Sequence, residues 1–282
     1  SSGYTTSLRN IGSIRNSGFE LQLDGRIIDR AVKWDLGVNF SLNRSKVLVL
    51  SEDKDIFGGE LDNTILKDQL NLMRVGEPMY VFYGYVEDGY DENGHIVYKN
   101  MDDDPAITAA DKTIIGDPNP DFLVNLTTAV SYKGFTLSAF FQSSIGNDIY
   151  SLSMAAQAYD YGYNGNTLRE VYYNHWTPEN PTAKYPNLDQ TSYKMSDRFV
   201  YDGSFVRLKN LELAYDVPCA RSKFIKRARV YVSAQNLFTI TSYPFWDPDI
   251  NANGGGSSMI QGVDSYCYPS ARTYTIGCRL TF

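Results

Sequence analysis

The chain has 282 residues, a net charge of −7 and an isoelectric point near 4.9; nucleic-acid binding is not expected, because phosphate binding needs a basic face. Aromatic residues make up 14% of the chain and histidine occurs only twice, a composition that argues against an ordinary soluble enzyme. The mean hydropathy of −0.34 and the lack of a run of about 18 apolar residues exclude a transmembrane helix, but not a transmembrane barrel, whose alternating strands average out as polar.

Two stretches near the N-terminus predict a pair of strands. Residues 19–27 and 34–42 each alternate apolar and polar side chains, which is typical of strands with one apolar face. The sequence before them shows no charged segment followed by an apolar one, so no signal peptide is visible. We expect that the signal was removed or that the chain starts internally.

Five further stretches predict the remaining strands. They span residues 122–132, 135–141, 205–217, 228–238 and 274–282. Within the third of these, the apolar positions change from even to odd numbers around Lys209 and Asn210, which predicts a β-bulge. The last strand carries an apolar residue at every second position and ends on Phe282.

The connections between the predicted strands alternate in length. Short connections cover residues 29–33, 133–134 and 218–226, and long segments cover about 46–120, 146–203 and 239–270. The short turns therefore fall at one end of the sheet and the long loops at the other, as in outer-membrane barrels. A soluble β-sandwich carbohydrate-binding module would also alternate, but it has no reason to segregate its long loops.

Seven strands cannot close a bacterial barrel, which has an even strand count and leaves no edge in lipid. We therefore expect residues 1–282 to be the C-terminal portion of a larger antiparallel transmembrane β-barrel, an all-β fold. A smaller outer-membrane barrel that acts as an enzyme or adhesin is the alternative. In either barrel, polar side chains are expected to line the interior: Glu20, Gln22, Asp24, Arg26, Asn39 and Asn125.

Several stretches carry a family resemblance. They are NIGSIRNSGFELQLDGR (10–26), TIIGDPNPDFLVNLTTAVSYKGFTLSAFFQSSIGNDIY (113–150), FVRLKNLELAYDVP (205–218), VYVSAQNLFTIT (230–241) and YPSARTYTIGCRLTF (268–282). Together they resemble the C-terminal barrel of SusC/RagA-type TonB-dependent transporters. The strings GDPNPDF, YKGF and GNDIY are the most specific part of the resemblance.

The resemblance implies a barrel of about 22 strands in a Gram-negative, Bacteroidetes-like outer membrane, with an N-terminal plug and TonB box outside this chain. It also implies a SusD-like surface lipoprotein as a lid, TonB as the energy-coupling partner, and an oligosaccharide or peptide as substrate. The terminal strand resembles the signal that the barrel-assembly machinery recognises; its residues are Tyr274, Ile276, Leu280 and Phe282.

Aromatic residues in the long loops are candidates for ligand or lid contact. They are Trp176, Trp246, Tyr172, Tyr173, Tyr243 and Phe245. Flat rings can stack on the apolar face of a sugar or hold a protein partner. The alternative is that these rings pack the long loops against one another.

An acidic loop is a candidate calcium site. Asn100, Asp102, Asp104 and Asp111 fall at positions 1, 3, 5 and 12 of an EF-hand-like loop, whose alternating oxygen ligands can surround calcium. Pro105 stands where the sharp turn needs glycine, and this departure favours a solvated acidic loop.

No catalytic site is predicted, and no cofactor is required. His95 and His175 have no nucleophile or carboxylate at motif spacing, and the loose acidic loop does not supply the paired carboxylates of a glycosidase. The three cysteines, Cys219, Cys267 and Cys278, are widely spaced and form no zinc motif.

Overall fold

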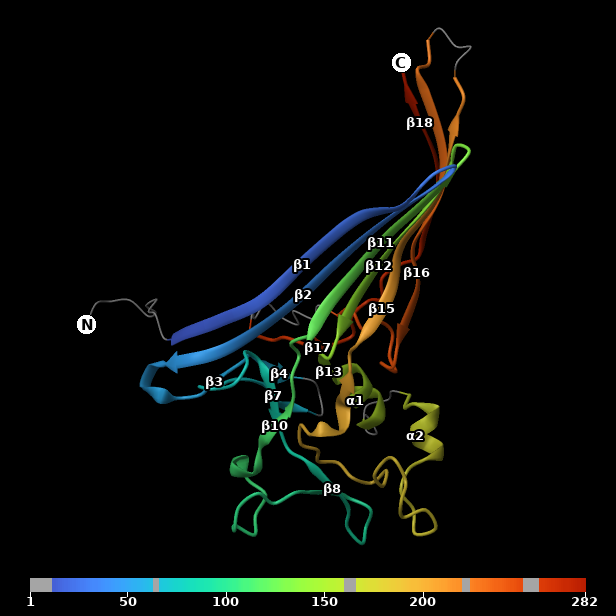
Figure 1. The fold of residues 1–282 in the computed structure, drawn as a ribbon. Helices are drawn as coiled ribbons and strands as arrows, with labels where there is room; N and C mark the ends of the chain where they lie inside the picture. The colour runs from blue at the N-terminus through green and yellow to red at the C-terminus, as the bar shows by residue number, and fades with distance from the viewer. Residues whose placement is uncertain (1–11, 63–65, 160–165, 220–223, 251–258) are drawn as a thin grey trace, which may run out of the picture.

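The computed structural model describes residues 12–62, 66–159, 166–219, 224–250 and 259–282. The described residues form a seven-stranded antiparallel sheet in which sequential strands are neighbours. We call it the strand wall (Figure 1). Its strands are β1 (Gly12–Asp29), β2 (Val32–Leu50), β11 (Phe122–Tyr132), β12 (Phe135–Ile145), β15 (Phe205–Val217), β16 (Arg227–Thr241) and β18 (Thr273–Thr281). All seven predicted strands are confirmed.

Two details of the strand wall test the sequence predictions. The predicted bulge is confirmed, because the register of β15 with β16 shifts between Leu208 and Asn210. The predicted start of the first long loop near residue 46 is wrong. Strand β2 continues to Leu50, which pairs with Gly12, so β1 and β2 form a hairpin of 18 and 19 residues.

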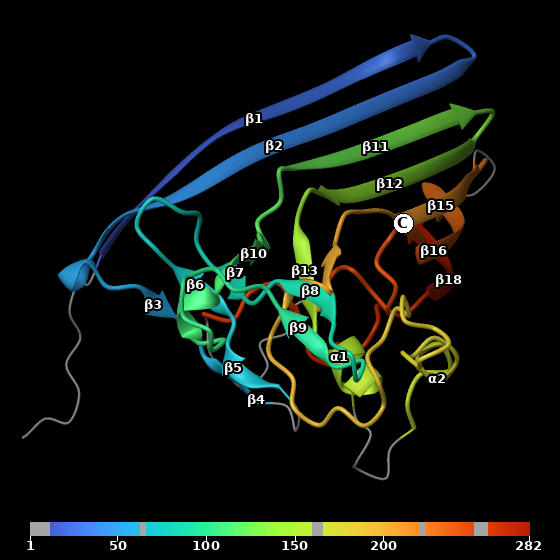
Figure 2. The same ribbon diagram turned by 90° about the horizontal axis from the view of Figure 1, so that it is seen from below.

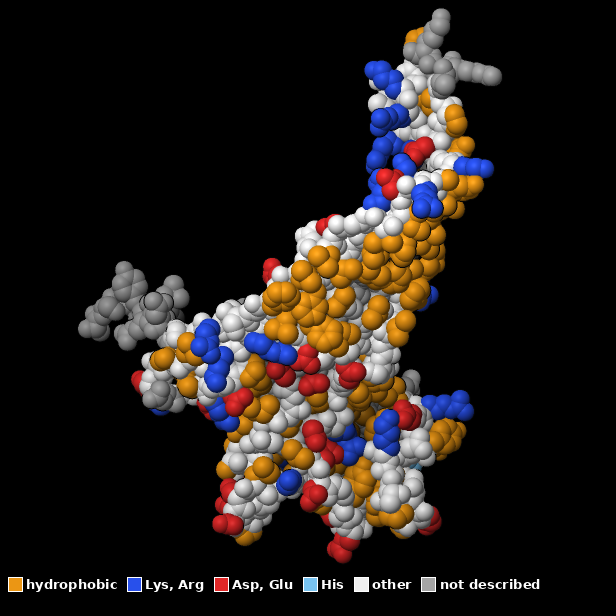
Figure 3. All heavy atoms as spheres, in the orientation of Figure 1, with side chains coloured by type: hydrophobic (Ala, Val, Ile, Leu, Met, Phe, Trp, Pro, Cys, Tyr) orange, Lys and Arg blue, Asp and Glu red, His pale blue; other side chains and the backbone are white. Residues whose placement is uncertain are grey.

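The outer face of the strand wall is apolar along a continuous register row. In this row each of the seven strands contributes one apolar residue, and each residue lies directly opposite the next across the neighbouring strands. The residues are Ile28, Trp34, Val130, Leu137, Leu213, Val232 and Ile276. Leu137 and Val232 are 48% and 46% exposed. Figure 3 shows the apolar side chains as a belt across the sheet. A β-sandwich would bury this face against a second sheet, and no such sheet lies on it in the described part of the chain.

The three long loops contain secondary structure of their own. They carry short strands, two helices and three 3₁₀ turns. The strands are β3 (Ile56–Phe57), β4 (Glu60–Asp62), β5 (Lys67–Gln69), β6 (Asn71–Met73), β7 (Val81–Gly84), β8 (Glu87–Tyr90), β9 (Ile96–Tyr98), β10 (Thr113–Gly116), β13 (Asp148–Ser151), β14 (Val200–Asp202) and β17 (Val263–Asp264). The helices are α1 (Leu152–Tyr159) and α2 (Arg169–Tyr173), and the turns are η1 (Ser51–Asp53), η2 (Ala109–Asp111) and η3 (Asp197–Phe199).

These loop elements pack as one unit, which we call the loop layer (described residues of 51–120, 146–203 and 242–270). Its four-stranded sheet, β10-β7-β6-β3, lies within the first loop. Strand β13 of the second loop pairs with β14 and with β17 of the third, and Tyr85 of the first loop forms a β-bridge with Ser196 of the second, so all three loops are joined. One apolar core is shared among them, with Phe82, Tyr150, Phe199 and Val263 almost completely buried. Among the described residues, no helix is long and apolar enough to cross a membrane.

The loop layer lies at one end of the strand wall, opposite the short turns (Figure 1). The predicted segregation of long and short connections is therefore confirmed. Seen from the loop end, the wall curves around the loop elements (Figure 2). Strands β1 and β18 are the two edges of the sheet.

Candidate substrate-contact surface

The inner face of the strand wall carries a polar row in register. Six side chains are direct neighbours across six strands: Gln22, Asn39, Asn125, Gln142, Arg207 and Thr239. Three of the six predicted interior residues, Gln22, Asn39 and Asn125, lie in this row, and strict alternation puts Glu20, Asp24 and Arg26 on the same face. Five of the six are amides or a hydroxyl, which donate and accept hydrogen bonds without a net charge of their own, and the sixth is the guanidinium of Arg207.

Charged groups on this face gather toward the short turns. Arg26 Nε lies 2.8 Å from Asp35 Oδ1, and Arg229 lies 3.5 Å from Glu212 and 3.3 Å from Asp216. These pairs are partly exposed, and each contributes at most about 1 kcal/mol to stability. Neutral polar groups therefore dominate the half of the inner face near the loop layer.

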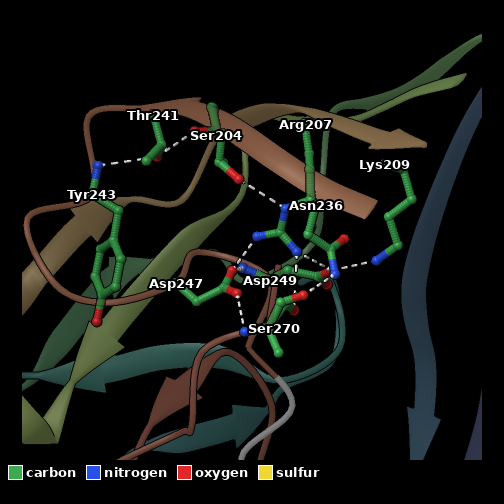
Figure 4. A network of polar contacts seen from close by, with 11 residues as sticks. Ser204, Arg207, Lys209, Asn236, Thr241, Tyr243, Asp247, Asp249 and Ser270 are labelled. Carbon is green, nitrogen blue, oxygen red and sulfur yellow. Dashed lines mark hydrogen bonds and ion pairs between the residues drawn. The ribbon is translucent and has the colours of Figure 1, made fainter. Parts of the chain in front are cut away.

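Arg207 is a charged residue in that half, and it anchors a loop onto the wall (Figure 4). Its side chain is 2% exposed, and its Nη2 pairs with Asp247. Nη1 donates to Asp249 Oδ2 and Ser270 Oγ, both at 3.2 Å, and Nε donates to Thr239 Oγ1 at 2.9 Å. Four of the five N–H donors of the guanidinium thus have partners, and two carboxylates oppose its charge, which compensates the cost of burying it.

Asp247 is held by the loop backbone as well as by Arg207. Its two carboxylate oxygens accept hydrogen bonds from the backbone N–H groups of Asp249 and Ser270, both at 2.9 Å. Burial alone would raise the pKa of Asp247, but the two backbone N–H groups and the guanidinium together hold that pKa below its ordinary value. The carboxylate therefore stays charged at neutral pH.

Arg207 was not among the functional residues predicted from the sequence. The available signal was a cation at an inner-face position of a strand, next to the bulge at Lys209 and Asn210. Its partners lie 40 and 42 residues further along the chain, at Asp247 and Asp249, so the pairing was not visible from local spacing.

The six loop aromatics fall into different environments. Tyr243 is 4% exposed, and its Oη hydrogen-bonds Asp264 Oδ2 at 2.6 Å and Ser151 Oγ at 2.9 Å. This buried hydroxyl joins two loops, so Tyr243 is a packing residue here and presents no surface to a ligand. Burial also raises the pKa of Tyr243.

Trp176 packs on the turn between β8 and β9. Gly94 has a φ of +79°, and a Cβ atom added there would lie 2.2 Å from Trp176 Cδ2. Glycine is needed in this turn both for the backbone conformation and for the close approach of the indole. Trp176 therefore also joins two loops.

The other aromatics form two exposed groups. Tyr172 and Tyr173 on α2 are 60% and 65% exposed, and their rings meet edge to face at 5.2 Å. Phe245 packs against the loop core and stacks on Trp246 at 4.7 Å, while Trp246 remains 58% exposed. These side chains are available to a ligand or a partner.

Trp246 and Arg207 line the same pocket beside β16. Its volume is about 490 Å³, and its walls also include Asn236, Asp247, Ser270 and Arg272. Asn236 lies in the left-handed region with a φ of +51°, and its Nδ2 donates to the backbone oxygen of Ala271 at 3.0 Å. A platform ring and several polar groups thus converge on one concave site.

The acidic loop has a defined conformation. The side-chain oxygens of Asn100, Asp102 and Asp104 each accept from the backbone N–H two residues further on, at 2.9–3.1 Å. Asp111 Oδ1 and Oδ2 accept from Met101 and Thr108, both at 2.7 Å, and these backbone hydrogen bonds lower the pKa of Asp111. Calcium binding by this loop stays a prediction.

Neither histidine belongs to a catalytic arrangement in the described chain. His95 Nε2 lies 2.9 Å from Asp189 Oδ1, and His175 Nδ1 lies 2.7 Å from the backbone oxygen of Tyr172. Within the described ranges, no group of three or more histidine, cysteine, aspartate or glutamate side chains is placed to hold a metal ion.

Comparison with known proteins gives consistent relatives, although no family model matches the chain. The chain is 32% identical to TonB-dependent receptor P3 of Formosa agariphila, a match that covers all of this chain and 30% of the relative. It is 28% identical to TonB-dependent receptor SusC of Bacteroides thetaiotaomicron, over 97% of this chain and 27% of the relative. The structure of the RagAB peptide transporter superposes with a TM-score of 0.79 at 26% identity, over all of this chain and 30% of that one.

The curved antiparallel wall, apolar outside and polar inside, is that of a transmembrane β-barrel segment. The chain belongs to the SusC/RagA-type TonB-dependent receptors, and the predicted resemblance is confirmed. These relatives are receptors and transporters, not enzymes. The chain spans about 30% of the length of the relatives that it matches.

Proposed function

We propose that the chain forms the C-terminal part of the barrel of a transporter that imports an oligosaccharide across the outer membrane, with TonB supplying the energy. The observation that carries this proposal is the polar row on the inner face, from Gln22 to Thr239, which contrasts with the apolar row outside. Amides and hydroxyls in register suit a hydroxyl-rich solute, which exchanges hydrogen bonds with water for similar ones along the wall.

The exposed loop aromatics support a sugar substrate and a lid. Trp246 lies beside the polar pocket, and Tyr172 with Tyr173 lies on α2 at the surface of the loop layer. We infer that a SusD-like surface lipoprotein covers the loop layer and that Tyr172 and Tyr173 belong to that contact. Exposed tyrosines in pairs are typical of protein interfaces.

The remaining barrel strands would lie outside this chain and pair with the edges β1 and β18. Seven strands with two open edges in lipid would leave unpaired backbone groups, each costing several kcal/mol. Strand β18 presents Tyr274, Ile276, Leu280 and Phe282, all exposed, which supports the proposal that the barrel-assembly machinery recognises it.

Peptide import is the second candidate, because the structural neighbours include a peptide transporter. The two candidates differ in the solute that the full-length protein must take up. We would delete the gene in its native host, restore it on a plasmid, and measure uptake of labelled oligosaccharides and of labelled peptides. Uptake of an oligosaccharide that depends on the restored gene supports the proposal, and dependence for peptides alone overturns it.

A further inference from the structure

The pocket beside β16 contains side-chain groups that take no part in anchoring the third loop (242–270) to the wall. The Arg207 network accounts for Asp247, Asp249, Ser270 and Thr239, since each of these groups is hydrogen-bonded within it. Three groups around the pocket remain available: the indole of Trp246, the side-chain oxygen of Asn236 and the guanidinium of Arg272.

Trp246 offers a flat platform to the pocket. Phe245 stacks on the indole at an interplanar angle of 19°, and more than half of Trp246 is still exposed. An indole held in place by a second ring loses little conformational freedom when a ligand stacks on its open face. The pocket volume of about 490 Å³ lies within the range of small-molecule sites and exceeds what a single water molecule needs.

Asn236 and Arg272 add one acceptor and one cation. Asn236 Oδ1 is buried and accepts no hydrogen bond from the described residues, so it needs a donor from elsewhere. The bulge that produces the left-handed backbone at Asn236 directs this amide to the pocket wall. The Arg272 side chain is exposed and has no carboxylate partner among the described residues, whereas Arg207 is compensated by Asp247 and Asp249.

We propose that this pocket binds one pyranose ring of the transported solute, with the ring stacked on Trp246 and an anionic substituent paired with Arg272. A ring hydroxyl donates to Asn236 Oδ1. The anionic group is a carboxylate or a sulfate ester, because both present oxygens that a guanidinium binds in a forked geometry. This inference rests on the proposed import of oligosaccharides and narrows it to acidic ones.

The test uses the purified full-length transporter in detergent. Binding is measured by calorimetry against short oligosaccharides of three kinds: neutral, uronate-containing and sulfated. We expect an acidic oligosaccharide to bind, with affinity reduced about tenfold or more by Trp246→Ala. Trp246→Phe should lose less affinity than Trp246→Ala, because phenylalanine still offers a smaller ring on which the sugar can stack.

Arg272→Gln should reduce affinity for the acidic ligand about tenfold at low salt and less at high salt, because the pair with Arg272 is screened. Asn236→Gly keeps the positive φ but removes the acceptor, and a severalfold loss is expected. Arg227→Gln, at an exposed arginine near the opposite end of β16, is the matched control and should bind as the parent does.

The outcomes separate the two proposals. An acidic glycan that binds equally to the parent, Trp246→Ala and Arg272→Gln proteins would overturn the proposed binding site in this pocket, but not the proposed import of oligosaccharides. Binding of a neutral glycan that needs Trp246 but not Arg272 would overturn the acidic assignment. Binding of peptides and of no glycan would overturn the proposed function, and this inference with it. The uronate and sulfate arms identify the anionic group.

Discussion

The strand wall and the loop layer bury their apolar side chains in opposite ways. In the wall, Phe19 and Ile276 are 56% and 87% exposed on the outer face, while the inner face is polar. In the loop layer, Phe82, Tyr150 and Val263 are buried, with polar groups outside. The two regions suit different solvents: the outer face of the wall suits lipid, and the surface of the loop layer suits water. The same chain thus follows two rules of burial, which mutations can separate.

The largest expected effect comes from emptying the loop core. Phe82 is fully buried and meets Tyr150 edge to face at 6.1 Å, so Phe82→Ala should destabilise the loop layer by about 3–5 kcal/mol. Hydrogen exchange of the full-length protein in detergent would measure the opening of the loop layer. The matched control is Phe19→Ala on the lipid-facing side, and equal loss of loop protection in both variants would contradict the division into two regions.

A charge introduced on each face of the wall should show the next largest difference. Leu213 lies in the outer apolar row, so Leu213→Arg should destabilise the folded barrel by about 2–4 kcal/mol if the row lies near the membrane midplane. Asn39→Arg puts the same group at an exposed position of the inner face, where water can solvate it, and should change stability little. Folding of both variants into lipid bilayers gives the comparison; similar costs would reverse the assignment of the faces.

The join between wall and loop layer should be sensitive to acid. The folded-state pKa of Asp247 is below its unfolded value of about 3.9, so its stabilisation is complete above that pH and is lost as pH falls through the folded pKa. We expect the parent to melt at a higher temperature than Asp247→Asn at neutral pH, and we expect this difference to be smaller below about pH 4. A gap that stays constant in acid would show that the charge of Asp247 does not anchor the loop.

The smallest effect concerns the acidic loop. If residues 100–111 bind calcium, as their spacing predicts, saturating calcium should raise the melting temperature by a few degrees through one-site linkage. The shift should disappear in Asp102→Ala and in Asp104→Ala, and calorimetry should give one site per chain. Heat and melting signals that are the same with and without calcium would leave a solvated acidic loop held by its own backbone hydrogen bonds.

The difference between the two regions also explains what the sequence could predict. A strand with one lipid-facing side has a strict period of two, so all seven strands, their order and the bulge near Lys209 could be predicted from the sequence. The core of the loop layer depends on contacts between distant segments, such as Phe82 with Tyr150, and no local period marks them. The Arg207 network could not be predicted either, because it also depends on contacts between distant segments. For the same reason Tyr243 was predicted as a ligand contact, although its hydroxyl is hydrogen-bonded to Asp264 and Ser151.

The shared core of the loop layer has a consequence for how new specificity can arise. Strand β13 from the second loop pairs with β14 of the same loop and with β17 of the third, and Tyr150 of β13 packs on Phe82 of the first. A single loop transplanted from a relative would have to match two foreign surfaces at once. We therefore expect the three loops to be exchangeable between relatives as a set, and chimaeras that exchange the whole set should be tolerated more often than those that exchange one.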